Sequence, residues 1–181
     1  MAFEIPDDLM VSVSGVRGRV GEALTPEIVA RFAAAFGAYL REGRSERPRV
    51  VLGRDSRTSG PMFARVATAA LQSVGCDVVD IGLAPTPTTL YAIRHHGAAG
   101  AIVVTASHNP VEWNALKFAS SVGMFLDADE GPRMRAYVAD RPIPRAGWDA
   151  IGGVSTDDAA VDRHRAAVLG IPFLDVEGLR R

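Results

Sequence analysis

Apolar residues along the chain follow two patterns, short β-branched runs and longer stretches with helical spacing. The helical spacing is clearest between Thr25 and Gly43. Thr25 is a typical N-cap residue, Pro26 and Glu27 suit the first turn of a helix, and the apolar residues that follow recur on one helical face. The same pattern predicts further helices over residues 62–74, 88–95, 129–138 and 157–169. The short apolar runs predict strands over residues 9–13, 49–52, 78–81, 99–104, 115–119 and 124–126.

The order of these elements predicts the fold. Two successive strand–helix–strand units with tight connections lie between residues 49 and 104, which is typical of a parallel sheet with helices on both faces. The run 101–104 is apolar at every position, as expected in the middle of such a sheet. Residues 115–126 are predicted as a hairpin, and residues 14–18 and 140–156 as loops. We therefore expect an α/β fold with three α/β/α layers around a mixed, mostly parallel sheet.

Composition narrows the classes of function. The 181 residues, 48% of them hydrophobic, suffice for one domain with a substantial core. The 20 basic and 21 acidic side chains leave a formal charge of −1, so the chain lacks the one-signed field that favours nucleic acid or an anionic membrane. The acidic start of the chain differs from a signal peptide, and no apolar run approaches the roughly 18 residues that cross a bilayer. We expect neither nucleic acid nor membrane as a partner.

Cysteine usage indicates the compartment. Cys76 is the only cysteine, so the chain can form neither an internal disulfide nor a site with several thiolate ligands. It lies between Gly75 and a β-branched run, where a buried thiol is expected. These features are typical of the reducing cytosol, and we predict a cytoplasmic location.

Candidate chemistry is concentrated in the loops after the predicted strands. Ligands of open α/β sheets bind beyond the carboxyl ends of the parallel strands. If the predicted topology holds, Arg17, Ser107 and His108 face one cleft, and Lys117 faces it from the next strand. A serine hydroxyl can accept and return a phosphoryl group, an imidazole can relay protons, and Lys and Arg can neutralise phosphate oxygens. The combination points to phosphoryl transfer.

These residues also have plainer interpretations. Ser, His, Asn and Pro are ordinary turn residues, so Ser107 and His108 could simply shape a loop. Lys117 could be a solvated lysine on an edge strand. A serine hydrolase is disfavoured, because no G-x-S-x-G motif surrounds Ser107 and no motif places an acid to orient His108.

Other polar and aromatic residues are open in the same way. Arg54, Asp55 and Arg57 could bind a ligand or form a structural ion-pair cluster, and the second interpretation is favoured. His95 and His96 at a helix end are expected at the surface, with no role in the site. The aromatic residues expected to pack in the core or in a lid are Trp113, Phe118 and Phe125.

Three motifs in order resemble one enzyme family. The chain reads S-G-V-R-G at 14–18, G-R-D-S-R at 53–57 and T-A-S-H-N-P at 105–110, the last followed by W-N-A-L-K at 113–117. These segments resemble the α-D-phosphohexomutases, which include phosphoglucomutases, phosphomannomutases and phosphoglucosamine mutases. The three motifs span much of the chain, which makes the resemblance specific.

The resemblance implies a role for each candidate residue. Ser107 would be carried as a phosphoserine whose phosphate contacts Mg²⁺. The other catalytic residues would be Arg17, His108 and Lys117, and Ser14 would bind substrate together with Arg17 and Lys117. The implied reaction interconverts hexose 1-phosphate and hexose 6-phosphate through a hexose 1,6-bisphosphate.

The resemblance also implies that parts of the enzyme lie outside this chain. Family members are typically four-domain enzymes, and this chain resembles only domain I, over residues 1–156. Residues 157–181 would form a helix and the start of a linker to domain II, whereas the metal, sugar and C-terminal phosphate loops (D-G-D-x-D-R, G-E-x-S-G and R-x-S-G-T) are absent. The partners would be a hexose phosphate and domains II to IV, and we expect the chain alone to have no appreciable mutase activity.

Two alternatives stay open. The chain could belong to a phosphoglucosamine mutase, or it could be a stand-alone, non-catalytic module that binds a phosphosugar or a partner. The apolar character of the C-terminal segment favours the larger enzyme, because such residues need a partner surface. They are Ile171, Phe173, Leu174, Val176 and Leu179.

Overall fold

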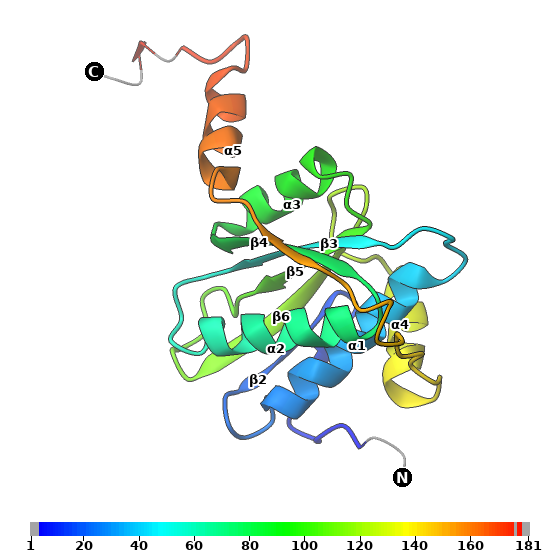
Figure 1. Cartoon of the computed structure of the whole chain (residues 1–181). Coiled ribbons are helices and arrows are strands. Elements are labelled where there is room, and N and C mark those ends of the chain that lie inside the picture. Colours follow the sequence, from blue (N-terminus) through cyan, green and yellow to red (C-terminus); the bar gives the residue numbers. More distant parts are fainter. Residues whose placement is uncertain (1–3, 176, 179–181) are drawn as a thin grey trace.

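The computed structural model describes residues 4–175, 177 and 178, and this part of the chain forms seven strands and five helices (Figure 1). The strands are β1 (Met10–Ser12), β2 (Gly15–Arg19), β3 (Arg49–Arg54), β4 (Asp77–Leu83), β5 (Gly100–Val104), β6 (Trp113–Ser120) and β7 (Val154–Thr156). The helices are α1 (Pro26–Arg41), α2 (Gly60–Ser73), α3 (Thr86–His95), α4 (Glu130–Ala139) and α5 (Ala160–Leu169).

The seven strands form one mixed sheet in the order β1-β2-β6-β5-β3-β4-β7. Strands β5, β3, β4 and β7 are parallel, whereas β6, β2 and β1 are joined to them and to each other by antiparallel pairing. β5 lies in the middle, as its apolar sequence predicts, and all five of its residues are buried. Because β3, β4 and β5 point the same way, the loops that follow them meet at one edge of the sheet.

Helices cover both faces of the sheet, which confirms the predicted three-layer α/β/α fold. On one face α1 packs against α2 and α4 over a large apolar cluster, in which the Phe36 ring lies 5.0 Å from the Phe118 ring of β6. On the other face α3 and α5 cover a smaller cluster that includes Val51 and Ile93. The N-cap prediction for α1 is also confirmed, because Thr25 Oγ1 accepts the backbone N–H of Ile28 at 3.5 Å.

The prediction of a loop over residues 14–18 is wrong. Only a tight turn separates β1 from β2, and Gly15–Arg19 pairs along β6. Glycine is typical of turns, but here it permits close packing: a Cβ at Gly15 would lie 2.6 Å from the Leu116 carbonyl oxygen, and one at Gly18 would lie 3.1 Å from Leu24. Glycines in this strand therefore let it approach its neighbours closely.

Three further boundaries differ from the prediction. Residues 124–126 form only a single bridge, between Phe125 and Ala119, and no second strand of a hairpin. The predicted loop 140–156 ends in the edge strand β7, which runs parallel to β4. α5 begins at Ala160 and not at residue 157, because the Asp157 carboxylate accepts the backbone N–H of Ala159, two residues on, and forms a turn before the helix.

Polar contacts attach α5 to α3. Asp157 accepts hydrogen bonds from Arg163 at 2.8 Å and bonds the His96 ring at 2.7 Å, so His96 has a structural partner that the sequence analysis did not assign. His164 stacks on Tyr91 of α3. Ala160 is the one residue of the helix that is buried, and Figure 1 shows α5 standing out from the body of the molecule.

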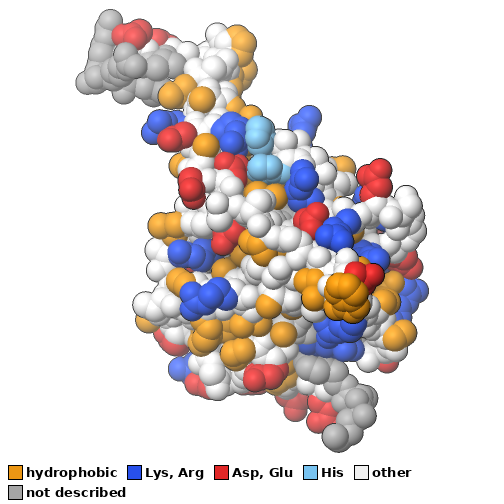
Figure 2. Space-filling model, in the orientation of Figure 1, with side chains coloured by type: hydrophobic (Ala, Val, Ile, Leu, Met, Phe, Trp, Pro, Cys, Tyr) orange, Lys and Arg blue, Asp and Glu red, His pale blue; other side chains and the backbone are white. Residues whose placement is uncertain are grey.

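The surface and the cysteine agree with the composition. Figure 2 shows basic and acidic side chains interspersed over the face in view, as a net charge of −1 leads one to expect. Cys76 is buried, and burial raises the pKa of its thiol to about 12, so the thiol is unreactive at neutral pH. None of the helices in the described part of the chain is long and apolar enough to span a membrane.

Replacing Asp157 tests the attachment of α5. The hydrogen bond from Arg163 is the main cause that holds the pKa of the Asp157 carboxyl well below its ordinary value of 3.8. A carboxylate of this kind stabilises the fold above its unfolded-state pKa and loses that contribution as the pH falls. We expect Asp157→Asn to lower the free energy of unfolding at pH 5, and the deficit to narrow at pH 3, in urea unfolding experiments.

Asp162→Asn is the matched control, because Asp162 lies on the same helix in an exposed ion pair with Arg165. It should change stability little at either pH. A deficit of Asp157→Asn that is equally large at pH 5 and pH 3 would contradict the assignment.

Candidate active site

One cavity of about 350 Å³ brings together the residues singled out by the sequence. It lies between the β1–β2 hairpin, the loop after β5 and the adjoining part of β6. The five candidates all line it: Ser14, Arg17, Ser107, His108 and Lys117. Arg19, the other basic residue of that hairpin, is not among the described lining residues and pairs with Glu22 instead.

Ser107 has an unusual backbone conformation. Its φ of 56° makes it the only non-glycine residue in the described chain with a left-handed backbone, a conformation that costs of order 1–2 kcal/mol for an L-residue. Its N–H donates to Thr105 Oγ1 at 3.0 Å, and its own hydroxyl lies 3.5 Å from His108 Nδ1, at the outer limit of a hydrogen bond. The turn exposes the Ser107 side chain to the cavity.

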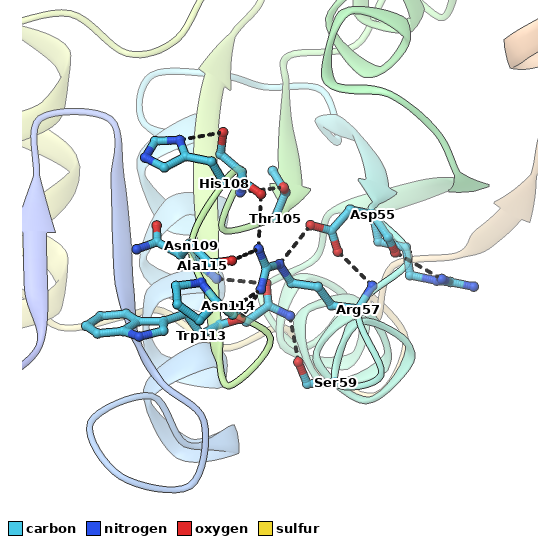
Figure 3. A network of polar contacts seen from close by, with 12 residues as sticks. Asp55, Arg57, Ser59, Thr105, His108, Asn109, Trp113, Asn114 and Ala115 are labelled. Atoms are coloured by element: carbon cyan, nitrogen blue, oxygen red, sulfur yellow. Dashed lines mark hydrogen bonds and ion pairs between the residues drawn. The ribbon is translucent and has the colours of Figure 1, made fainter.

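Arg57 binds the serine loop from the neighbouring strand end (Figure 3). Its guanidinium pairs with Asp55 at 3.2 Å, which confirms the predicted ion pair. It also donates to backbone carbonyl oxygens of the loop, which the sequence analysis missed: those of Ser107, Asn109, Pro110 and Trp113. The parallel pairing of β3 with β5 explains these contacts, because it places the loops after Arg54 and Val104 side by side.

Arg17 reaches the same loop from β2. Its Nη1 donates to the Asn109 side-chain oxygen at 2.9 Å, and its Nη2 contacts the Met10 sulfur at 3.7 Å. Asn109 therefore contacts two arginines, Arg17 through its side chain and Arg57 through its backbone carbonyl. Buried Asn114 was also missed by the sequence analysis; its amide donates to Ser59 Oγ at 2.8 Å and holds the start of β6 against α2.

Strand register places Lys117 and Arg17 on one face of the sheet. Gly15 lies opposite Lys117, and Ala115 lies opposite Arg17, so each long cation faces a small residue across the strand pair. Lys117 belongs to β6, an interior strand, so its interpretation as an edge lysine is wrong. Its ammonium lies 5.3 Å from the centre of the Phe125 ring, a favourable cation–π contact.

Ser107 also lines a second cavity, of about 580 Å³, together with residues of the loops after β3 and β4. Arg57, Thr86 and Asn109 contribute to that wall. Ser107 therefore borders both cavities.

The described residues do not by themselves fit Mg²⁺, which prefers several carboxylate, phosphate or water oxygens in octahedral geometry. They contain no group of three or more His, Cys, Asp or Glu residues that could hold a metal. Around Ser107 the side chains are a hydroxyl, an imidazole and an amide, and the nearby carboxylate of Asp55 is occupied by Arg57. Near Ser107, the described residues therefore offer a serine oxygen but no group of acidic ligands.

Comparison with known proteins decides the family. The model for the phosphoglucomutase/phosphomannomutase α/β/α domain I matches residues 9–141. The chain belongs to this family. The resemblance of the three sequence motifs is thereby confirmed, and so is its restriction to domain I.

Relatives in the phosphoglucomutase/phosphomannomutase family carry two names. A phosphoglucomutase/phosphomannomutase of Thermococcus kodakarensis is 43% identical over 145 residues, which are 80% of this chain and 32% of the relative. A probable phosphoglucosamine mutase of Methanopyrus kandleri is 38% identical over 167 residues, 92% of this chain and 36% of the relative. This chain thus spans about a third of the length of the curated relatives that it matches.

Solved structures of the family agree with the fold. A phosphoglucomutase/phosphomannomutase family protein from Burkholderia thailandensis superposes with a TM-score of 0.73 at 27% sequence identity. The match covers 90% of this chain and 36% of that protein. The mixed seven-stranded sheet with helices on both faces is therefore the fold of the family's domain I.

Substitutions at Ser107 test the backbone strain. Glycine adopts a positive φ without a steric penalty, whereas alanine retains the penalty, and both remove the hydroxyl. We expect Ser107→Gly to exceed Ser107→Ala in unfolding free energy by about 1 kcal/mol, measured by urea denaturation. A more stable alanine variant would contradict a left-handed conformation at this position.

Proposed function

We propose that this chain is the phosphoserine-bearing domain of a mutase that interconverts hexose 1-phosphates and hexose 6-phosphates. The observation that carries the proposal is the single cavity in which Ser107 lies with Arg17, His108 and Lys117, in a member of this family. Ser14 lines the same cavity at the β1–β2 turn and is proposed to contact substrate.

In the proposed reaction, the phosphoryl group on Ser107 passes to the free hydroxyl of a bound hexose phosphate. The bond from the serine oxygen to phosphorus breaks as the bond from the sugar oxygen to phosphorus forms, and the sugar hydroxyl gives its proton to Lys117. The hexose 1,6-bisphosphate then turns over and returns its other phosphoryl group to Ser107. The freed serine oxygen is proposed to take up a proton from His108, whose Nδ1 lies 3.5 Å away and must move closer during the step.

Lys117 supports this assignment through its residue type. It is the only lysine among the 20 basic residues of the chain, and the other 19 are arginines. Arginine stays protonated in proteins, whereas lysine can both neutralise a phosphate and give up a proton. We infer that Lys117 transfers a proton to or from the sugar oxygen, while Arg17 neutralises the transferring phosphoryl group.

Mg²⁺ enters the proposal only through the phosphate on Ser107. When bound, the ion would neutralise negative charge on that phosphate. The described residues add no carboxylate ligand of their own, so the remaining ligands are proposed to come from other domains, as the family resemblance implies. Residues 1–156 are accordingly proposed as domain I, and residues 157–181 as a helix and the start of a linker.

The substrate is proposed to be a phosphate of glucose, mannose or glucosamine. Two probable phosphoglucosamine mutases match more of this chain at slightly lower identity than the relative with the other name, so that activity is an equal alternative. A stand-alone binding module is less favoured. In the segment after α5, Phe173 is 90% exposed to solvent, and an exposed apolar residue of this kind is expected to pack against a partner surface. Val176 and Leu179 of the same apolar segment lie outside the described residues. The cytoplasmic location stays a prediction.

A chimera tests the function. The N-terminal third of the Thermococcus relative would be replaced by this chain, and conversion of glucose 1-phosphate, mannose 1-phosphate and glucosamine 1-phosphate would be followed. We expect turnover of at least one sugar by the chimera, none by its Ser107→Ala variant, and none by the isolated chain. A folded chimera that is inactive beside an active parent, or an active Ser107→Ala variant, would contradict the proposal.

Lys117→Arg in the same chimera tests proton transfer. The substitution keeps the positive charge but removes a group that can give up a proton, so we expect kcat to fall by about 100-fold or more. Arg65→Lys on the exposed face of α2 is the matched control and should leave kcat unchanged. A Lys117→Arg variant with the parent kcat would show that Lys117 acts only as a charge.

A further inference from the structure

We infer that Arg57 is a positioning residue for the phosphoryl-transfer step: it holds Ser107 in its left-handed conformation and does not itself bind phosphate. The functional half of this inference rests on the proposed function, whereas the conformational half rests on contacts of Arg57 alone. The sequence allowed two roles for Arg57, ligand binding or a structural ion pair. The geometry shows the ion pair together with a second role, the binding of the serine loop.

All five N–H donors of the Arg57 guanidinium are used within the protein. Nε donates to Asp55 Oδ2 at 3.2 Å. Nη1 donates to the carbonyls of Pro110 at 2.6 Å and Trp113 at 3.0 Å, and Nη2 to those of Ser107 at 3.0 Å and Asn109 at 2.6 Å. A planar guanidinium has five donors and no more, so none remains for a phosphate oxygen.

Burial and charge lead to the same conclusion. The Arg57 side chain is only 11% exposed, and its charge is balanced by Asp55, which also accepts the Arg57 backbone N–H at 3.1 Å. Arg17, by contrast, donates hydrogen bonds to one amide oxygen and to one sulfur, both weaker partners than a carboxylate. Arg17 is therefore the arginine suited to an incoming phosphate, and Arg57 is the one suited to hold the loop.

The contacts determine the conformation of Ser107 directly. In the peptide group before Ser107, the Ser107 N–H donates a hydrogen bond to Thr105 Oγ1. In the peptide group after it, the Ser107 carbonyl oxygen accepts a hydrogen bond from Arg57. With both flanking peptide planes fixed, φ and ψ of Ser107 are fixed too, and the direction of its Cα–Cβ bond follows. Four carbonyl contacts across residues 107–113 provide the interaction energy that offsets the strain of a positive φ.

The same guanidinium acts on Arg17 through one shared residue. Asn109 gives its backbone carbonyl to Arg57 and its side-chain oxygen to Arg17. Loss of the Arg57 contacts would therefore release Ser107 and move the partner of Arg17 at the same time. Lysine cannot replace Arg57, because a tetrahedral ammonium with three donors cannot reach four carbonyls and a carboxylate in one plane.

NMR spectroscopy of the isolated chain tests the conformational half without any enzymatic activity. The ¹³Cα and ¹³Cβ shifts of Ser107 report a positive φ, and amide exchange of Ser107, Asn109 and Trp113 reports the hydrogen bonds of the loop. We expect Arg57→Lys to lose the left-handed shift signature and to exchange these amides about tenfold faster, with the amides of β3 and β5 unchanged. Arg65→Lys, the exposed control, should match the parent chain.

Asp55→Asn is a milder second variant, because it keeps an acceptor for Arg57 and should shift the same signals in the same direction by a smaller amount. If Arg57→Lys keeps the left-handed signature and the parent exchange rates, the inference is wrong. If Arg57→Lys does not fold, Asp55→Asn decides alone: unchanged Ser107 shifts in that variant would overturn the inference.

Titration with inorganic phosphate tests the functional half. We expect phosphate to shift the Arg17 side-chain and Ser107 amide signals of the parent chain, and Arg57→Lys to weaken that binding by about tenfold, since the anion site is no longer preformed. Equal phosphate affinity in both proteins would refute a positioning role. A parent chain that binds no phosphate while Arg57→Lys loses the left-handed signature would contradict the proposed function and support the conformational half.

Discussion

A single guanidinium, bound by two neighbouring loops, determines the geometry of the candidate site. Arg57 follows β3, Ser107 follows β5, and these two strands are adjacent and parallel in the sheet. Ser107 has a left-handed backbone conformation. The strain energy of a positive φ is comparable to the energy of one or two hydrogen bonds, so the loop would relax to another conformation without contacts that hold it. Contacts of Arg57 and Thr105 with the flanking peptide groups oppose that relaxation.

The antiparallel part of the sheet supplies the remaining charges. A purely parallel sheet would place only loops near Ser107, but here β6 turns back beside β5 and carries β2 with it. Lys117 and Arg17 therefore project from strand interiors, where their backbone is fixed on both sides. Gly15 and Ala115 lie across from them and leave room for the two long side chains. Two kinds of pairing in one sheet thus direct a serine from a loop and cations from strands into one cavity.

Local patterns were sufficient to predict most of the fold and much of the site. Helical spacing and β-branched runs located all five helices and the central strands of the described chain, and three motifs pointed to the residues that line the cavity. Errors arose where tertiary packing overrides a local signal. Gly15 was predicted as a turn residue, because the amino-acid sequence does not show that its backbone packs closely against Leu116 of β6. The carbonyl contacts of Arg57 were missed for a related reason, since backbone acceptors leave no mark in the sequence.

The central claim is that Ser107 carries the phosphoryl group, and phosphopeptide mapping tests it most directly. The chimera with the Thermococcus relative would be incubated with glucose 1,6-bisphosphate, digested, and its peptides analysed by mass spectrometry. The account predicts one phosphorylated residue, Ser107, whose phosphate disappears when hexose phosphate is added. Phosphate on another residue, or an active chimera with no phosphate on Ser107 at any stage, would contradict it.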